Sequence, residues 1–221
     1  MKPRIVQALL SLLVAVLVIG LIWIRERYEQ AHPSKSKSPA STASWETLES
    51  CRLVPHPTND GDSFVVTHGS STHTFRLYFV DCPEKELRRD NRSRLEDQAR
   101  YFGLPSAEAA SSVGQASAGF VLPYLKRPFT VITQWERVFD SQRYYARVIV
   151  ETDHHQQRDL AELLVENGYA RIFTKGAHLP GTPSESRFKK HLHTLESASR
   201  AAQRGAWHPW RVDVPKSKML R

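Results

Sequence analysis

The sequence has very few cysteines, since Cys51 and Cys82 are the only two among its 221 residues. Two thiols are too few for a disulfide-stapled scaffold or for a cysteine-based zinc framework. Acidic residues are the minority among the charges: 23 Asp and Glu stand against 31 Lys and Arg, which gives a net charge of +8. This excess is compatible with a polyanionic partner, either nucleic acid or an anionic membrane, but it selects neither. The apolar fraction of 40% excludes a fully disordered or collagen-like chain.

A long apolar run is present near the N-terminus, at residues 5–24, where only Gln7 and Ser11 interrupt it. About 20 residues at ~1.5 Å each cross a bilayer core of ~30 Å, so the run predicts a transmembrane helix. A cleaved secretion signal is the alternative, but it would have a shorter apolar core with small residues directly after it. Arg25 and Arg27 follow instead. An uncleaved single-pass anchor is therefore the favoured interpretation.

The segment after this run is polar and has no apolar periodicity. Residues 29–44 are rich in Ser, Pro, Ala and Lys, which is typical of a flexible linker. The sequence thus predicts a membrane anchor at residues 1–28, a linker at 29–44, a folded domain at 45–210 and a basic tail at 211–221. Positive charges flank the apolar run on both sides, so their count does not fix its orientation. We expect the N-terminus in the cytoplasm and the domain outside it, in the periplasm or the extracellular space.

The folded part alternates short β-rich segments with helical ones. Strands are expected at residues 51–56, 62–66, 72–80, 129–134 and 144–150. Helices are expected at residues 88–102, 106–123, 159–167 and 185–204. Five short strands with a helix inserted after the third are typical of a small closed barrel of the oligonucleotide-binding (OB) type. The expected fold class is therefore α+β, a five-stranded OB barrel with about three packed helices.

Three short motifs gather polar residues that could carry chemistry. Asn-Asp-Gly-Asp-Ser spans residues 59–63, Phe-Arg-Leu-Tyr-Phe-Val-Asp-Cys-Pro-Glu spans residues 75–84, and Tyr-Tyr-Ala-Arg spans residues 144–147. Each motif also has a plain structural explanation. Asp-Gly pairs mark turns, Asp-x-Pro-Glu can cap a helix, and an arginine on a strand is usually at the surface. Their significance lies in their combination and order.

In this order and spacing, the motifs resemble the thermonuclease family, which consists of staphylococcal nuclease-like domains. The family pattern is Asp-Gly-Asp-Thr, then Arg-Leu-x-x-x-Asp-x-Pro-Glu, then Tyr-Gly-Arg. The resemblance extends from about Ser50 to Trp207 and includes the helical segment at residues 159–170. It implies an OB barrel and calcium-dependent hydrolysis of phosphodiester bonds in DNA or RNA, with 3′-phosphate products.

The resemblance also implies which residues hold the metal. Asp62 and Asp81 match the carboxylates that bind calcium, and Cys82 stands where a backbone carbonyl completes the ligand shell. On chemical grounds as well, hard oxygen ligands suit a hard cation such as Ca²⁺. The family has Thr at the position of Cys82, and the role of the carbonyl tolerates this change.

The remaining matches concern the phosphate. By resemblance, Glu84 orients or deprotonates the attacking water, and Arg76 and Arg147 bind the phosphate and its transition state. Tyr145 matches the aromatic residue beside the scissile phosphate. A guanidinium suits this task because its planar fork fits two phosphate oxygens. Ala146 replaces the family's Gly, a change that would cost about 1 kcal/mol if this position needs a positive φ.

The basic segment at residues 85–103 is longer than the family minimum. It can be a lid, a phosphate-contacting loop or plain solvated surface, and the surface interpretation is favoured because charged runs are usually solvated. A disulfide between Cys51 and Cys82 is also left open, because the sequence does not give the distance between them.

The expected function is that of a membrane-anchored, monomeric nuclease that uses Ca²⁺ and acts on nucleic acid outside the cytoplasm. There calcium is plentiful, and a nuclease does not threaten the cell's own nucleic acid. The alternative is a catalytically inactive module of the same fold that binds nucleic acid or protein at the membrane. A decayed module would have lost several of the five implied residues. All five are present, namely Asp62, Arg76, Asp81, Glu84 and Arg147.

Overall fold

The computed structural model describes residues 44–179 and 181–209 of the chain. By its internal contacts the chain divides into two units, Met1–Ala43 and Ser44–Arg221. The predicted anchor helix at residues 5–24 and the predicted basic tail lie outside the described residues. Within the described part of the chain, no helix is both long and apolar enough to cross a membrane.

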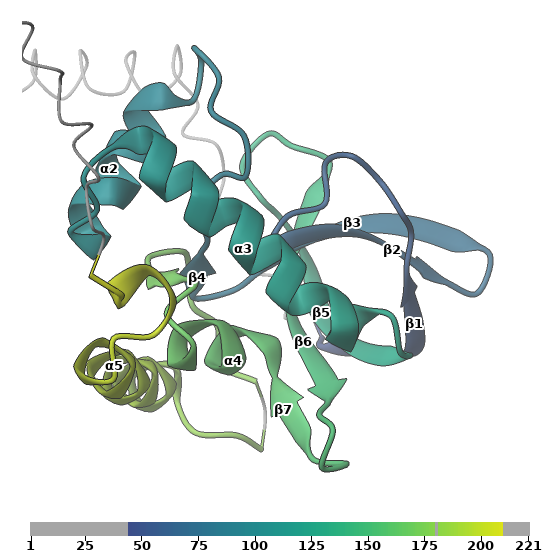
Figure 1. The fold of residues 1–221 in the computed structure, drawn as a ribbon. Helices are drawn as coiled ribbons and strands as arrows, with labels where there is room; N and C mark the ends of the chain where they lie inside the picture. Colours follow the sequence, from purple (N-terminus) through teal and green to yellow (C-terminus); the bar gives the residue numbers. More distant parts are fainter. Residues whose placement is uncertain (1–43, 180, 210–221) are drawn as a thin grey trace, which may run out of the picture. The chain divides into compact units, whose positions relative to one another are not determined.

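A closed barrel of five strands forms the centre of the second unit (Figure 1). Its strands are β1 (Glu46–Leu53), β2 (Ser63–His68), β3 (Ser71–Leu77), β5 (Phe129–Arg137) and β6 (Arg143–Glu151). The pairs β1–β2, β1–β5, β2–β3 and β5–β6 are antiparallel. A parallel pairing of β3 with β6 closes the barrel, with Thr74 opposite Arg143. The predicted α+β class with a five-stranded OB barrel is therefore confirmed.

Four α-helices pack around the barrel within the described residues, where the sequence predicted about three. They are α2 (Arg92–Phe102), α3 (Ala107–Leu125), α4 (Leu160–Glu166) and α5 (Glu185–Ala201), and a 3-10 turn, η1 (Gly205–Trp207), follows them. Ser106, Asp159 and Ser184 cap α3, α4 and α5, because each side chain accepts a hydrogen bond from a backbone N–H of the first turn. In Figure 1, α3 crosses the barrel, and α4 lies beside α5.

The chain turns sharply after β3, at a point where the sequence analysis expected one continuous strand over residues 72–80. Phe79 has φ 70°, a left-handed value that does not occur in extended strands. After this turn, β4 (Val80–Asp81) pairs with β8 (Arg171–Ile172) in a separate two-stranded sheet. The turn therefore takes Asp81 out of the barrel and places it beside the strand that carries Arg171.

Several other boundaries differ from the prediction. The first strand begins at Glu46 instead of Cys51, and α3 continues through Pro123 to Leu125. A proline in the last turn of a helix removes only the bond of its own missing N–H, so the helix does not end there. A short strand, β7 (Gln157–Asp159), pairs with β6 and leads directly into α4.

Two hydrophobic clusters stabilise this unit. The larger one fills the barrel and includes Phe64, Phe75 and Val148, and the smaller one joins α2 to α3 through Leu95 and Phe102. Burying each such side chain stabilises the fold by ~1.5–3 kcal/mol. Because the smaller cluster fixes α2 against α3, it also determines which polar side chains of α2 face the end of β4.

The two cysteines do not form a disulfide, since both are buried and free. Cys51 Sγ lies 3.3 Å from the carbonyl oxygen of Leu48. Burial, followed by the nearby negative charges of Asp62, Asp60 and Asp81, raises the pKa of the Cys82 thiol well above its usual value. Cys82 is therefore a neutral thiol, and its backbone N–H and carbonyl bind Asp62 and Gln98.

Candidate active site

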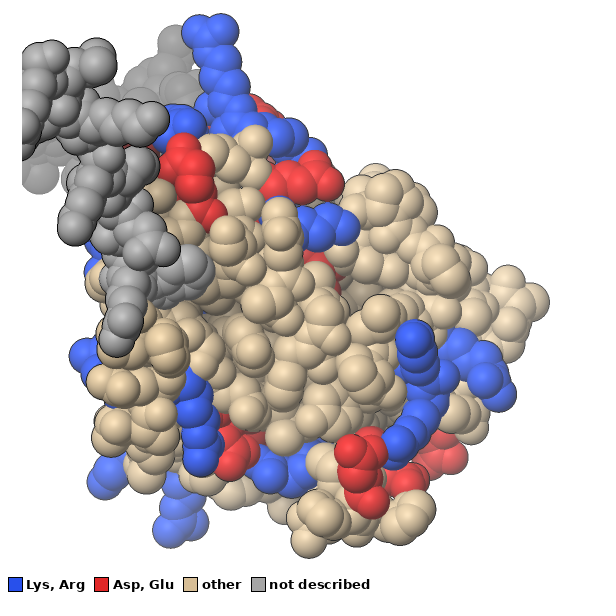
Figure 2. Space-filling view, in the orientation of Figure 1, with Lys and Arg blue, Asp and Glu red and all other residues tan. Residues whose placement is uncertain are grey.

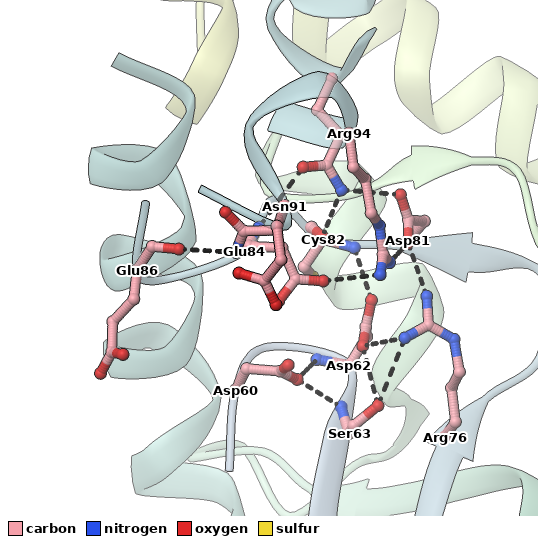
Figure 3. Close-up of polar contacts among 12 residues, drawn as sticks. Asp60, Asp62, Ser63, Arg76, Asp81, Cys82, Glu84, Glu86, Asn91 and Arg94 are labelled. Atoms are coloured by element: carbon pink, nitrogen blue, oxygen red, sulfur yellow. Dashed lines mark hydrogen bonds and ion pairs between the residues drawn. The ribbon is translucent and has the colours of Figure 1, made fainter. Parts of the chain in front are cut away.

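Asp62, Arg76 and Asp81, all predicted from the sequence, meet in a buried polar cluster (Figure 3). Arg76 Nη1 lies 3.0 Å from Asp62 Oδ1, and Arg76 Nη2 lies 2.5 Å from Asp81 Oδ1. A buried charge is stable only when it is paired and hydrogen-bonded. The Arg76 guanidinium thus holds the carboxylates of Asp62 and Asp81, which come from different segments of the chain, close to each other.

The backbone at the start of β2 supports this arrangement. Ser63 is paired with Arg76 in the antiparallel register of β2 and β3. The Asp60 carboxylate accepts hydrogen bonds from the N–H groups of Asp62 at 3.1 Å and Ser63 at 2.7 Å. Such a bond pattern is typical of a turn built by an aspartate side chain. Burial, followed by the charges of Asp62 and Glu84, raises the pKa of Asp60 well above its usual value.

Asp81 is surrounded by N–H donors. Its Oδ1 atom accepts from Arg76 at 2.5 Å and from Arg94 at 2.6 Å. Its Oδ2 atom accepts from Gln98 at 2.9 Å and from Arg171 at 2.7 Å. Burial alone would raise its pKa, but the guanidiniums of Arg94, Arg76 and Arg171 outweigh burial and hold the pKa below its usual value. The carboxylate is therefore ionised, and both of its oxygens are engaged.

The three predicted calcium ligands are neighbours in this cluster. Cys82 N–H donates to Asp62 Oδ2 at 2.6 Å, and Gln98 Nε2 donates to both Asp81 Oδ2 and the Cys82 carbonyl, at 2.9 and 3.0 Å. These are hard oxygen donors of the kind that calcium prefers. Among the described residues, however, no group of three or more His, Cys, Asp or Glu side chains is arranged as a metal centre. The donor types therefore fit calcium, provided that one of the N–H donors gives way.

Glu84 lies at the more open side of the cluster. Its side chain is 22% exposed, and its Oε1 atom lies 2.7 Å from Arg94 Nη1. Its backbone N–H donates to Gln98 Oε1 at 3.4 Å, which ties this segment to α2. Gly114 of α3 packs against the same segment, because a Cβ at Gly114 would lie 2.4 Å from the carbonyl oxygen of Glu84. Two helices thus hold the backbone of Glu84 in place.

Gly114→Ala is expected to lower the free energy of unfolding by about 1–3 kcal/mol. The added methyl would meet the carbonyl oxygens of Pro83 at 2.5 Å and Glu84 at 2.4 Å. At Gly119, in the same helix, a Cβ would meet nothing within 4 Å, so Gly119→Ala should stabilise α3 by ~0.5–1 kcal/mol. Denaturant unfolding of both variants measures the difference. Equal stability of Gly114→Ala and the wild type would contradict this close packing.

The structure does not bring Arg147 to the cluster, contrary to the prediction from the sequence. Arg147 Nε donates to Asp159 Oδ2 at 2.7 Å, and its guanidinium lies 4.2 Å from the ring centre of Phe188. Asp159 caps α4, and Phe188 belongs to α5. Arg147 therefore ties β6 to two helices. Ala146 has no positive φ, so the replacement of the family's Gly causes no strain.

A different arginine, Arg143 at the start of β6, lies with the cluster. Arg143 Nη1 donates to Ser63 Oγ at 3.4 Å, and Arg76 Nη1 donates to the same hydroxyl at 3.4 Å. Ser63 Oγ donates in turn to Asp62 Oδ1 at 3.1 Å. The parallel register explains why this arginine is present, because Arg143 pairs with Thr74, two residues before Arg76 on the same face of β3.

A basic cavity of about 580 Å³ opens beside the cluster. Its lining includes Arg76, Arg94, Arg143, Tyr145 and Lys175. Tyr145, which the sequence placed near the phosphate, pairs with Arg76 across β3 and β6, and its ring stacks on another tyrosine at a centroid distance of 5.0 Å. Guanidiniums that line a cavity of this size provide the planar, multiply donating groups that bind phosphate oxygens.

The face of the molecule over α3 is different in character. Figure 2 shows Lys, Arg, Asp and Glu side chains along the margins of this face and an uncharged surface at its centre. The sequence of α3 explains this, because Glu108 is the only charged residue among its 19 residues. A polyanion is therefore expected to bind at the cavity and not along α3.

Four residues that bind within the cluster were not predicted from the sequence, namely Arg94, Gln98, Arg143 and Arg171. Two of them, Arg94 and Gln98, lie in the basic segment that was interpreted as solvated surface. Arg143, Tyr145 and Arg147 lie on one face of β6. The period-two pattern therefore places two arginines on that face and does not indicate which of them reaches the cluster. Arg171 carried no signal, because its partner Asp81 is 90 positions away in the sequence.

A family model described as staphylococcal nuclease homologue matches residues 74–209, which is more than half of the chain. The matched range includes Arg76, Asp81, Glu84 and Arg143, whereas Asp62 precedes it. No curated protein matches the chain. The resemblance that three short motifs indicated is confirmed by this match.

Proposed function

The chain belongs to the family of staphylococcal nuclease homologues, and from this membership we propose that it is a calcium-dependent nuclease that hydrolyses phosphodiester bonds of DNA, RNA or both. Membership by itself supports a nuclease-type hydrolase. One observation carries the more specific proposal: the Arg76 guanidinium holds the Asp62 and Asp81 carboxylates together, at the edge of a cavity that Arg143 also lines.

Arg76 and Arg143, two of the arginines that line this cavity, are the groups that bind the substrate phosphate. Attack on phosphorus produces a pentacoordinate transition state with increased negative charge on its equatorial oxygens. Arg76 and Arg143, both linked to the Ser63 hydroxyl, present N–H donors from two strands toward this charge. Donors that are fixed before the reaction stabilise developing charge without reorganisation, and each is typically worth ~10²–10³ in rate.

Glu84 is the group that accepts the proton of the attacking water. As the water oxygen bonds to phosphorus, the proton passes to the carboxylate, and the bond between phosphorus and the 5′ oxygen breaks. The departing 5′ oxygen takes a proton from a solvent water, which leaves a 5′-hydroxyl and a 3′-phosphate. Calcium held by Asp62, Asp81 and the Cys82 carbonyl would supply a Lewis acid that neutralises charge on the phosphate.

The place of action follows from the N-terminal sequence. We propose that residues 5–24 anchor the chain in a membrane and that the catalytic domain, a monomer, lies outside the cytoplasm. The length of the apolar run supports the anchor, and the plentiful calcium outside the cytoplasm supports the orientation. Fractionation of cells that express the full chain, followed by protease treatment of intact cells, tests the location. A chain that stays in the soluble fraction would contradict the anchor.

Cleavage by the full-length protein in mild detergent tests the nuclease proposal. Single-stranded DNA and RNA are suitable substrates, because Phe139 and Phe173 line the cavity with exposed rings on which unpaired bases can stack. With Ca²⁺ we expect cleavage to 3′-phosphate ends, and chelation with EDTA should lower the rate at least ~10-fold. Re-addition of Ca²⁺ should restore it.

Two results would contradict the proposal. Cleavage that is unchanged by EDTA would rule out the calcium dependence but not the nuclease. Binding of the oligonucleotides without cleavage under any condition would favour the catalytically inactive binding module instead. A gel assay for cleavage and a fluorescence anisotropy assay for binding, performed on the same samples, separate these outcomes.

A further inference from the structure

The helix α2 delivers an additional guanidinium to the candidate active site. Arg94 Nη2 lies 2.6 Å from Asp81 Oδ1, and Arg94 Nη1 lies 2.7 Å from Glu84 Oε1. Figure 3 shows the Arg94 side chain reaching from its helix to the space between these two carboxylates. The Arg94 guanidinium therefore bridges Asp81, a predicted metal ligand, and Glu84, the predicted proton acceptor.

The contact sets Arg94 in competition with any metal at this site. A calcium ion needs the oxygens of Asp81, and Glu84 must be free to approach a water molecule. Both groups are engaged by the same arginine in charge-assisted bonds, which are the stronger kind. Charge acts in the same direction, since a nearby guanidinium repels a divalent cation. Without calcium, the Arg94 guanidinium supplies positive charge between the carboxylates of Asp81 and Glu84.

Arg94 is also the one of three arginines on Asp81 that is free to leave. Its side chain is 40% exposed, whereas those of Arg76 and Arg171 are 6% and 7% exposed. The ring of Phe173 further restrains Arg171, because the Arg171 guanidinium lies 3.9 Å from its centre. Moving Arg94 into solvent breaks its two bonds, one to Asp81 and one to Glu84, at the edge of the cluster.

We propose that Arg94 is a resident cation, which calcium must displace from Asp81 before Glu84 becomes available to water. This inference rests on the proposed function, because it concerns the metal site of the same reaction. Displacement couples the two events: the ion that binds Asp81 also releases Glu84. Arg94 thereby sets the calcium concentration at which the site is assembled.

Calorimetric titration of the full-length protein with CaCl₂ tests the proposal. Arg94→Met removes the charge and keeps the length of the stem, so we expect calcium to bind at least ~10-fold more tightly, equal to about 1.4 kcal/mol. Arg94→Lys keeps the charge but loses the fork and should lie between Met and the wild type. Arg92→Met is the control, because Arg92 is 51% exposed on the same helix and pairs with Glu108. Its calcium affinity should equal that of the wild type.

Calcium affinity in Arg94→Met that is equal to or weaker than in the wild type would overturn the proposal. A second measurement covers the case in which this variant does not fold: a crystal structure of the wild type with calcium bound. The Arg94 guanidinium is expected to have left Asp81 there, and its retention on Asp81 beside a bound ion would also overturn the proposal.

The affinity measurement is separate from the nuclease proposal. Tighter binding in Arg94→Met with no cleavage of any oligonucleotide would leave the role of Arg94 intact and refute the nuclease. Cleavage that depends on calcium, with the same calcium affinity in the wild type and Arg94→Met, would refute the displacement and keep the nuclease.

Discussion

Replacing Glu84 by glutamine is expected to slow phosphodiester cleavage by ~10²-fold or more, the range that a positioned general base contributes. Glutamine preserves the shape of the side chain and one oxygen acceptor for Arg94, but it cannot take a proton from water. Because the Glu84 side chain is partly exposed, at 22%, its loss of charge should leave the melting temperature within a few degrees of the wild type. Single-turnover cleavage at saturating calcium measures the effect on the chemical step.

Glu86→Gln is the matched control for this experiment. Glu86 lies two residues further along, its side chain is 64% exposed, and in Figure 3 its carboxylate points away from the cluster. This variant should cleave at the rate of the wild type. If Glu84→Gln and Glu86→Gln behaved alike, the assignment of Glu84 as proton acceptor would have to be abandoned.

Replacing Arg143 and Arg147, the two arginines of β6, one at a time should separate an effect on the cleavage rate from an effect on stability. Arg143→Met is expected to lower the cleavage rate ~10²-fold or more, because it removes a guanidinium from the phosphate cavity. Arg147→Met should instead lower the free energy of unfolding by ~3–5 kcal/mol, because Asp159 would be left as a buried charge without its partner. Cleavage per folded molecule should be unchanged in Arg147→Met.

Activity and unfolding measurements on both variants test this division of roles. The comparison is informative because both residues are arginines on the same face of β6 and differ only in their position along the strand. Loss of cleavage in Arg147→Met at a temperature where the variant remains folded would return Arg147 to the active site. Full activity of Arg143→Met would remove Arg143 from it.

The acidic half of the candidate site was predictable from the sequence for a physical reason. Asp62 directly precedes β2, Arg76 lies on the paired strand β3, and Asp81 and Glu84 follow β3 closely, so all four residues are near one another along a single hairpin and its continuation. The carboxylates of Asp62 and Asp81 are 14 and 5 positions from Arg76. Contacts of such short range are encoded in motif spacing, and the spacing was read correctly.

The basic half was not predictable in the same way. The sequence Tyr-Ala-Arg imitates the family's Tyr-Gly-Arg, yet in the parallel register of β3 and β6 it is Arg143, and not Arg147, that shares the Ser63 hydroxyl with Arg76. That register depends on how the whole barrel closes. Arg94 depends on the packing of α2 against α3, which buries Leu95 next to it. Neither arrangement leaves a local pattern in the sequence.

The same applies to the elements of the fold. The starts of α3 and α4 lie within one residue of the predicted ones, at Ser106 and Asp159, because a cap is a local hydrogen bond. The break at Phe79 was missed, because a left-handed φ at a phenylalanine has no signal in an apolar strand sequence. This break is what separates Asp81 from the barrel strand and points it toward α2.

The parallel closure of the barrel also determines when the catalytic centre is completed during synthesis. Arg143 is 80 positions beyond Ser63, and Arg171 is 90 positions beyond Asp81. Contacts between such distant positions form late in folding, because the intervening loop must be ordered first. A nascent chain therefore holds Asp62, Arg76 and Asp81 long before Arg143 and Arg171 are synthesised.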